Sequence, residues 1–146
     1  MLHFWSPPMI SFHLTTMAIP LLIFYLDETT RFTATIKGEF LCHHNMSNMV
    51  KVEMWDHDPI KDDDMGEYQI PVMENRTAQV SVIGEGMEGA FAGTIDAYLY
   101  IRSYCNPDQS ETIGCIVPPP MADYAVYDFG LADLEHTDKP PFSKCP

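Results

Sequence analysis

The chain has 146 residues, a length typical of a single domain. Its 21 acidic residues outnumber its 8 lysines and arginines, so the formal net charge is -13. This balance excludes a typical nucleic-acid-binding protein, because neutralising phosphates requires a surplus of Lys and Arg on one face. It also argues against simple electrostatic docking on anionic lipid. Hydrophobic residues make up 46% of the chain, which is enough for a packed core.

The first 26 residues contain no Lys, Arg, Asp or Glu, and residues 17–26 form an apolar run. A membrane-spanning helix needs about 20 apolar residues, so we expect no transmembrane segment here. The run is typical of the apolar region of a secretory signal peptide, and we expect residues 1–26 to form one. The alternative is a hydrophobic strand or helix of the mature fold, since no Lys or Arg precedes the run and no A-x-A-like cleavage site follows it.

Two further features favour a secreted, extracellular protein. The sequence contains N-x-[ST] sequons at Asn45 and Asn75, and we expect both to be glycosylation sites. Its four cysteines are an even number in a small domain, which is typical of a disulfide-bonded secreted protein. The alternative is four free, buried thiols in a cytosolic domain. A zinc site is disfavoured, because the sequence has no C-x₂-C pair.

Apolar and polar residues alternate with a period of two along much of the chain, which predicts half-buried β-strands. The expected strands cover residues 31–42, 49–55, 67–72, 79–83, 97–105, 113–117 and 124–134. Pro71 indicates that the third of these lies at a sheet edge. Residues 85–94 fit a short helix or a loop, and the proline-containing tail, 136–146, is expected to run irregularly over the surface. Seven strands with short connections predict an all-β sandwich.

An ordered set of short motifs resembles the transthyretin-like family of secreted nematode proteins. Residues 38–42 read Gly-x-Phe-Leu-Cys, and residues 50–56 read Val-x-Val-x-Met-Trp-Asp. A loop with neighbouring aspartates follows at 62–64, and then a strand that begins Ile-Asp-x-Tyr-Leu at residue 95. The four cysteines come in the order that the family shows. The similarity extends from residue 31 to about residue 145.

The resemblance implies a transthyretin-type Greek-key β-sandwich of seven to eight strands, made of two four-stranded sheets. We expect this domain in residues 27–135, followed by the tail 136–146. The resemblance also implies secretion and a non-enzymatic binding role, as a carrier or adaptor for a lipid, a small apolar ligand or a cell-surface partner, without a cofactor. The chain departs from the family at Ala97 and Ser103, where the family usually has Pro and His.

The four cysteines allow three pairings. Cys105 and Cys115 flank Asn-Pro-Asp, a turn signal, so we expect them to pair across a hairpin. Cys42 would then pair with Cys145 and hold the tail across the sandwich. The sequence alone leaves the connectivity open.

The densest group of charges lies in residues 56–67. Neighbouring carboxylates can bind Ca²⁺, and the weak candidates for such a site are Asp56, Asp58, Asp62, Asp63 and Asp64. The run also resembles the calcium loop of C2 domains, so a calcium-dependent lipid-binding C2-like module is the first alternative function. A C2 domain needs a second acidic loop earlier in the chain, which this sequence lacks. An EF-hand fits only in part, because Ile60 and Lys61 stand where a ligand and Gly are required.

We therefore expect no metal at this loop, and interpret it as a solvated turn whose charges deter edge pairing. His43, His44 and His57 are likewise expected to be exposed turn residues. The second alternative function is an enzyme of the 5-hydroxyisourate hydrolase type, which shares the transthyretin-type sandwich. Those enzymes carry a His on the first strand and end in Tyr-Arg-Gly-Ser, and this chain has neither feature. No G-x-S-x-G nucleophile motif is present, so we expect no enzymatic activity.

Three tyrosines, Tyr98, Tyr100 and Tyr104, alternate with Leu99 and Ile101 along the fifth predicted strand. If the aliphatic residues face the core, the tyrosines face outward. Tyrosine is favoured in protein interfaces, because it offers a large amphipathic surface at low entropic cost. These three tyrosines are therefore interface candidates, for a partner or in a homo-oligomer. The alternative is a face covered by neighbouring loops or by the tail.

Overall fold

A computed structural model describes residues 30–44, 49–88 and 94–146. These residues form seven strands and no helix, which confirms the all-β class. The strands are β1 (Thr30–Leu41), β2 (Met49–Asp56), β3 (Asp63–Pro71), β4 (Thr77–Glu88), β5 (Ala97–Ser103), β6 (Thr112–Ile116) and β7 (Val126–Asp133). Each predicted strand corresponds to one of them. A helix with the length and apolar character to span a membrane is absent from the described segments.

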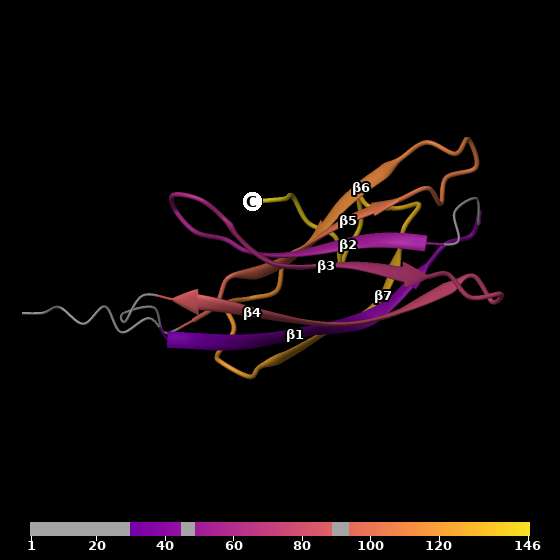
Figure 1. Cartoon of the computed structure of the whole chain (residues 1–146). Helices are drawn as coiled ribbons and strands as arrows, with labels where there is room; N and C mark the ends of the chain where they lie inside the picture. Colours follow the sequence, from indigo (N-terminus) through magenta and orange to yellow (C-terminus); the bar gives the residue numbers. More distant parts are fainter. Residues whose placement is uncertain (1–29, 45–48, 89–93) are drawn as a thin grey trace, which may run out of the picture.

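The strands form two sheets that lie over one another as a sandwich (Figure 1). One sheet has the order β4-β1-β7, and the other has the order β3-β2-β5-β6. β1 and β7 are parallel, and every other neighbouring pair is antiparallel. The expected sandwich is therefore confirmed, but within the described residues one sheet has three strands instead of four. The chain after β7 makes turns and one isolated bridge, so it adds no further strand to that sheet.

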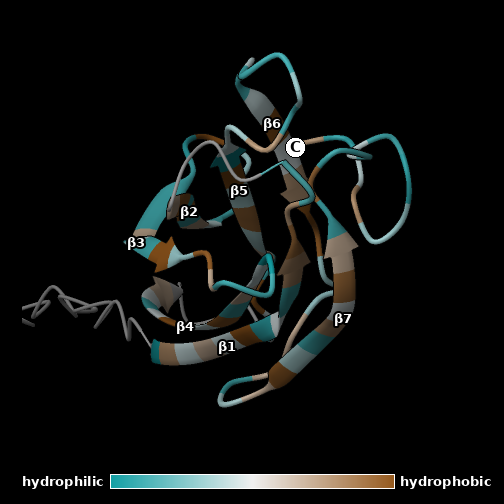
Figure 2. Ribbon diagram, turned by 90° about the vertical axis from the view of Figure 1, so that its right-hand side faces the viewer, coloured by the Kyte–Doolittle hydropathy of each residue, from teal (hydrophilic) through white to brown (hydrophobic). Residues whose placement is uncertain are grey.

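The period-two pattern of the sequence places one face of each sheet in the core. β2 is the clearest case, because Val50, Val52 and Met54 are fully buried while the residues between them are partly exposed. Shifting such a strand by one residue would move its apolar side chains to solvent, so the pattern specifies the register. Brown, hydrophobic positions alternate with teal, hydrophilic ones along the strands in Figure 2.

Large side chains fill the space that inward-facing glycines leave in the core. The ring of Phe129 on β7 lies against Gly38 and stacks on Phe40, with 5.3 Å between the Phe40 and Phe129 ring centroids. Met54 and Met65 fill the space at Gly84 in the same way. The centre of the sandwich is therefore occupied by the protein's own side chains.

All four cysteines form disulfides, as expected, but the expected pairing is wrong. Cys42 pairs with Cys105, and Cys115 pairs with Cys145, each with a Cα–Cα distance of 5.2 Å. In the β5–β6 hairpin, Ser103 lies opposite Thr112, which brings Cys105 opposite residue 110 if the ladder is extended. Cys115 then lies about 16 Å farther along the strand, at about 3.3 Å per residue. A disulfide cannot bridge that distance, because its Cα atoms lie no more than about 7 Å apart.

Cys42 follows β1 in one sheet, and Cys105 follows β5 in the other, so their disulfide joins the two layers. The tail beyond residue 135 is irregular, as predicted, and Pro71 ends an edge strand, as predicted. Of the segment expected as a helix or loop, residues 85–88 belong to β4 instead, and residues 89–93 lie outside the described residues. The expected signal peptide, 1–26, and the sequon at Asn45 also lie outside them.

Candidate functional site

The outer face of the four-stranded sheet combines aromatic and charged side chains in register. Across β2 and β5, Trp55 lies opposite Tyr98, Glu53 opposite Tyr100, and Lys51 opposite Arg102. Register partners lie on the same face of a sheet. Because Leu99 and Ile101 are fully buried on the inner face, the tyrosines of β5 lie on the outer face, as the alternation predicts.

The three tyrosines differ in how far neighbouring segments cover them. Tyr98 is only 8% exposed, because residues of the acidic loop lie against it, and its hydroxyl donates a 2.7 Å hydrogen bond to Asp62 Oδ2. Tyr100 is half-buried, and its hydroxyl makes no hydrogen bond to the described part of the chain. Tyr104, just beyond β5, is 44% exposed and donates to Glu111 Oε1 at 3.2 Å. One end of the face is thus covered by a loop, and the other end is open.

Ion pairs join the charged side chains at the open end. Lys51 Nζ lies 2.9 Å from Glu53 Oε1 and 3.1 Å from Glu67 Oε2, and Arg102 Nη2 lies 2.8 Å from Glu111 Oε1. The hydrogen bond from Lys51 holds the pKa of Glu53 below its ordinary value. A shallow hollow of about 290 Å³ lies at this end. Its lining residues are Met49, Lys51, Gln69, Arg102, Tyr104 and Glu111.

The acidic loop is organised around Asp62. Besides the bond from Tyr98, Asp62 Oδ1 lies 3.0 Å from His57 Nδ1 and accepts the backbone N–H of Asp58 at 3.3 Å. The bond from Tyr98, followed by that from His57, lowers the pKa of Asp62 below its ordinary value. Burial, followed by the bond to Asp62, raises the pKa of the Tyr98 hydroxyl well above its ordinary value. The loop is therefore tied to the outer face of the sheet.

Other carboxylates of the acidic loop also accept hydrogen bonds from the protein itself. Asp56 is buried and accepts the backbone N–H of Asp96 at 3.1 Å, and Asp64 accepts that of Gly66 at 2.8 Å. In the described segments, no three His, Cys, Asp or Glu side chains are arranged to hold a metal ion. The five candidate aspartates therefore do not converge on a common centre.

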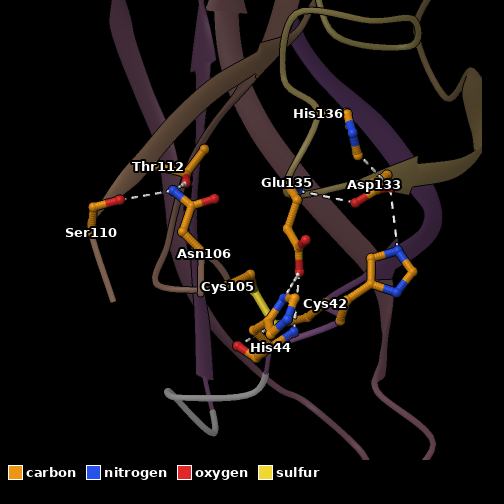
Figure 3. Close-up of polar contacts among 10 residues, drawn as sticks. Cys42, His44, Cys105, Asn106, Ser110, Thr112, Asp133, Glu135 and His136 are labelled. Carbon is orange, nitrogen blue, oxygen red and sulfur yellow. Dashed lines mark hydrogen bonds and ion pairs between the residues drawn. A yellow bond between two sulfur atoms is a disulfide. The ribbon is translucent and has the colours of Figure 1, made fainter. Parts of the chain in front are cut away.

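The histidines after β1 lie within hydrogen-bond distance of carboxylates that follow β7, an arrangement that was not predicted from the sequence (Figure 3). His43 Nε2 lies 3.3 Å from Asp133 Oδ2, and His44 Nδ1 lies 2.8 Å from Glu135 Oε1. His136 Nδ1 lies 2.9 Å from the same oxygen of Asp133. These histidines are about half exposed, as expected for turn residues, but they connect the end of β1 to the end of β7. The parallel pairing of Leu41 with Asp133 brings the two ends together, and no local sequence pattern encodes it.

Asp133 lies at the centre of this group. Burial raises its pKa, but hydrogen bonds from the Glu135 N–H, His136 and His43 together outweigh burial and lower the pKa below its ordinary value. His57 lies at the far end of β2 and pairs with Asp62 instead. The three histidines of the sequence analysis therefore form no common site.

The second sequon lies in the exposed turn between β3 and β4. Asn75 Oδ1 accepts hydrogen bonds from Thr77 N at 3.3 Å and from Thr77 Oγ1 at 3.0 Å. The Asn75 side-chain nitrogen, to which a glycan would attach, makes no hydrogen bond to the described residues. Its accessibility is compatible with the predicted glycosylation.

Comparisons with known proteins indicate no function for this chain. No protein-family model matches the chain, and no curated protein matches it. Among solved structures, the chain is similar to a 9R-lipoxygenase from Cyanothece PCC8801, with 15% sequence identity and a TM-score of 0.30. The match covers 70% of this chain and 16% of the lipoxygenase chain. A similarity this weak supports no conclusion about fold or activity.

Proposed function

We propose that the chain is a secreted, non-enzymatic, transthyretin-like binding protein that acts as an extracellular adaptor for a cell-surface protein. The two-sheet sandwich and the two disulfides support this proposal, because disulfides persist in oxidising compartments. The transthyretin-type topology is part of the proposal and rests on the ordered sequence motifs.

An adaptor fits this molecule better than a carrier that encloses a small apolar ligand. Phe129, Met54 and Met65 occupy the space beside the inward-facing glycines, and β2 and β5 bury their aliphatic residues directly between the sheets. A ligand inside the sandwich would have to displace these side chains, at a cost comparable to overpacking a core. A partner is therefore more easily bound on the surface.

One observation favours the open end of the tyrosine-bearing face as the contact surface. Tyr100 presents a half-buried ring and a hydroxyl that no described residue satisfies, next to Arg102 and the exposed Tyr104. Tyr and Arg are enriched in protein interfaces, where a ring held in place loses little entropy on binding. The paired charges around them fit a partner with a polar, mixed-charge surface.

The test is binding of purified, labelled chain to intact cells that express it, with Tyr100→Ser compared with wild type. We expect Tyr100→Ser to weaken binding about tenfold, the effect of losing about 1.4 kcal/mol at an interface. Ile83→Ser is the control, because Ile83 lies on the outer face of the other sheet, where it is 55% exposed, and should leave binding unchanged. Equal binding by wild type and Tyr100→Ser would exclude this face as the contact surface for the partner.

Mass spectrometry of chain recovered from conditioned medium tests the cellular part of the proposal. We expect a processed N-terminus, intact disulfides and glycan on Asn75. Retention of the whole chain inside cells would contradict secretion. Turnover of 5-hydroxyisourate by the purified chain would contradict the non-enzymatic assignment.

A further inference from the structure

The edges of the two sheets are protected in different ways. An edge strand exposes unpaired N–H and C=O groups, and proteins block such edges with charges, proline or bulges. β3 carries four acidic or proline residues, namely Asp63, Asp64, Glu67 and Pro71. β7 carries Asp128 and a bulge at Gly130, and β4 carries Glu85. Among the described edge strands, β6 alone has no charge, proline or bulge.

The C-terminal tail covers this unprotected edge from both faces of the sheet. On the inner face, the buried ring of Phe142 lies against Gly114. At the edge itself, the Ser143 N–H donates to the Cys115 carbonyl at 2.9 Å. On the outer face, Cys115 lies beside Tyr100 and forms its disulfide with Cys145. The C-terminus accordingly lies close to β6 in Figure 2.

We infer that residues 142–145 are a clip that closes the β6 edge, and that the Cys115–Cys145 disulfide is a lock which a thiol reductant opens. With the clip released, β6 becomes free to pair with β6 of a second copy. The Ser143–Cys115 bond shows that the backbone C=O of Cys115 points away from β5, out of the edge of the sheet. The backbone groups of successive residues alternate between the two sides of a strand, so those of Ile113, two residues earlier, point out of the same edge.

A second copy is the occupant that the charge distribution favours. Each chain carries a net charge of -13, which opposes self-association over most of the surface. Residues 112–117 carry no charge, so an antiparallel pair of β6 strands would bring no like charges opposite each other. Pairing would also cover Ile113 and Val117, which are 47% and 39% exposed.

The lock differs from the other disulfide in accessibility. Cys42 and Cys105 are both buried, whereas Cys145 is partly exposed beside buried Cys115. A thiolate of an external dithiol attacks Cys145 Sγ and breaks the bond to Cys115 Sγ, which leaves as a thiolate and takes up a proton. The second thiol of the reagent then displaces Cys145, which also becomes a thiol. The dithiol is oxidised to its cyclic disulfide, and the two protein sulfurs are reduced.

The first test is graded reduction of the native full chain with a dithiol, followed by alkylation and peptide mapping. We expect the unreduced map to show Cys42–Cys105 and Cys115–Cys145. With reductant, Cys115 and Cys145 should become labelled at least about tenfold faster than Cys42 and Cys105, because access controls thiol exchange. Equal rates, or the reverse order, would overturn the lock.

The second test measures oligomeric state by light scattering after size-exclusion chromatography. The oxidised wild type should be a monomer, and Cys115→Ser/Cys145→Ser should show twice that mass. Adding Ile113→Lys to the double variant should restore the monomer, because a charge on the strand blocks edge pairing. Circular dichroism checks that each variant is folded. If the double variant does not fold, wild type reduced only at Cys115 and Cys145 replaces it.

Either of two results would overturn the inference. One is a wild-type protein that is already paired through β6 while its clip disulfide is intact. The other is a folded, unlocked protein that stays monomeric while hydrogen exchange shows the amides of Ile113 and Cys115 unprotected.

Discussion

Asp62 shows how a single carboxylate can organise a loop. It accepts hydrogen bonds from Tyr98 Oη and from the Asp58 N–H and lies within hydrogen-bond distance of His57 Nδ1, so it joins both sides of the acidic loop to β5. The interpretation of this loop as a solvated turn is thus incomplete, because Asp62 is hydrogen-bonded to the sheet. The contact spans 36 residues of sequence and could not be read from any local pattern.

We predict that Tyr98→Phe lowers the free energy of unfolding by about 1.5 kcal/mol, since a hydrogen bond to a charged group contributes about 1.5–3 kcal/mol. Urea denaturation followed by circular dichroism measures the change. Tyr104→Phe is the matched control: it removes the bond to Glu111 from a more exposed site and should cost less than about 0.5 kcal/mol. Equal losses in both variants would contradict the role assigned to Asp62.

At the scale of the element, β1 and β7 illustrate two uses of glycine. Gly38 on β1 leaves room for the Phe129 ring, which a Cβ at this position would overlap. Gly130 on β7 has a φ of 73°, a left-handed conformation, and the space around it is open. It lies at the β7 bulge, where the register between β1 and β7 shifts, and the Asp128 side chain accepts its N–H at 2.9 Å.

We predict that the two alanine substitutions differ in cost. Gly38→Ala forces the Phe129 ring to move within a packed core and should destabilise the protein by about 2–3 kcal/mol. In Gly130→Ala the new Cβ contacts no other atoms, so only the left-handed backbone conformation lowers the free energy of unfolding, by about 1 kcal/mol. Urea midpoints of the two variants give the comparison, and a larger loss for Gly130→Ala would refute the packing argument.

At the scale of the whole molecule, hydrogen-bonded carboxylates determine how the free energy of unfolding changes at low pH. Asp62 and Asp133 bind donors from distant segments, and the pKa of each lies below its ordinary value in the folded state. The unfolded chain therefore takes up protons at these groups at a higher pH than the folded chain does. Their stabilising contribution is complete above the unfolded pKa of about 3.9 and is lost as the pH falls through the folded pKa.

We predict that the free energy of unfolding decreases as the pH falls below about 4, and that Asp133→Asn makes this decrease shallower. Urea titrations at a series of pH values measure both slopes. Asp123→Asn on an exposed loop is the control and should change the slope less, because Asp123 accepts a hydrogen bond from the Thr33 N–H, whereas three donors surround the Asp133 carboxylate. Stability that rises as the pH falls below 4 would reverse the predicted sign.

The sequence by itself determined the class of the fold and the strands. Period-two alternation is a local property, and it located the seven strands of the described residues and the inner face of β5. Pro71 indicated the edge position of β3. The even cysteine count indicated disulfides, and four cysteines form two. The alternation also placed Tyr98, Tyr100 and Tyr104 on the outer face, although it carried no information on which of them a loop covers.

Only the tertiary structure decided which distant segments meet. It paired Cys42 with Cys105 across the two sheets, brought His43 to Asp133 at the ends of parallel strands, and laid the tail over β6. The physical reason is that each of these contacts depends on the register between strands far apart in sequence. Alternation along one strand specifies which of its residues face the core, but which distant strands become neighbours is set by how the apolar faces of both sheets pack together.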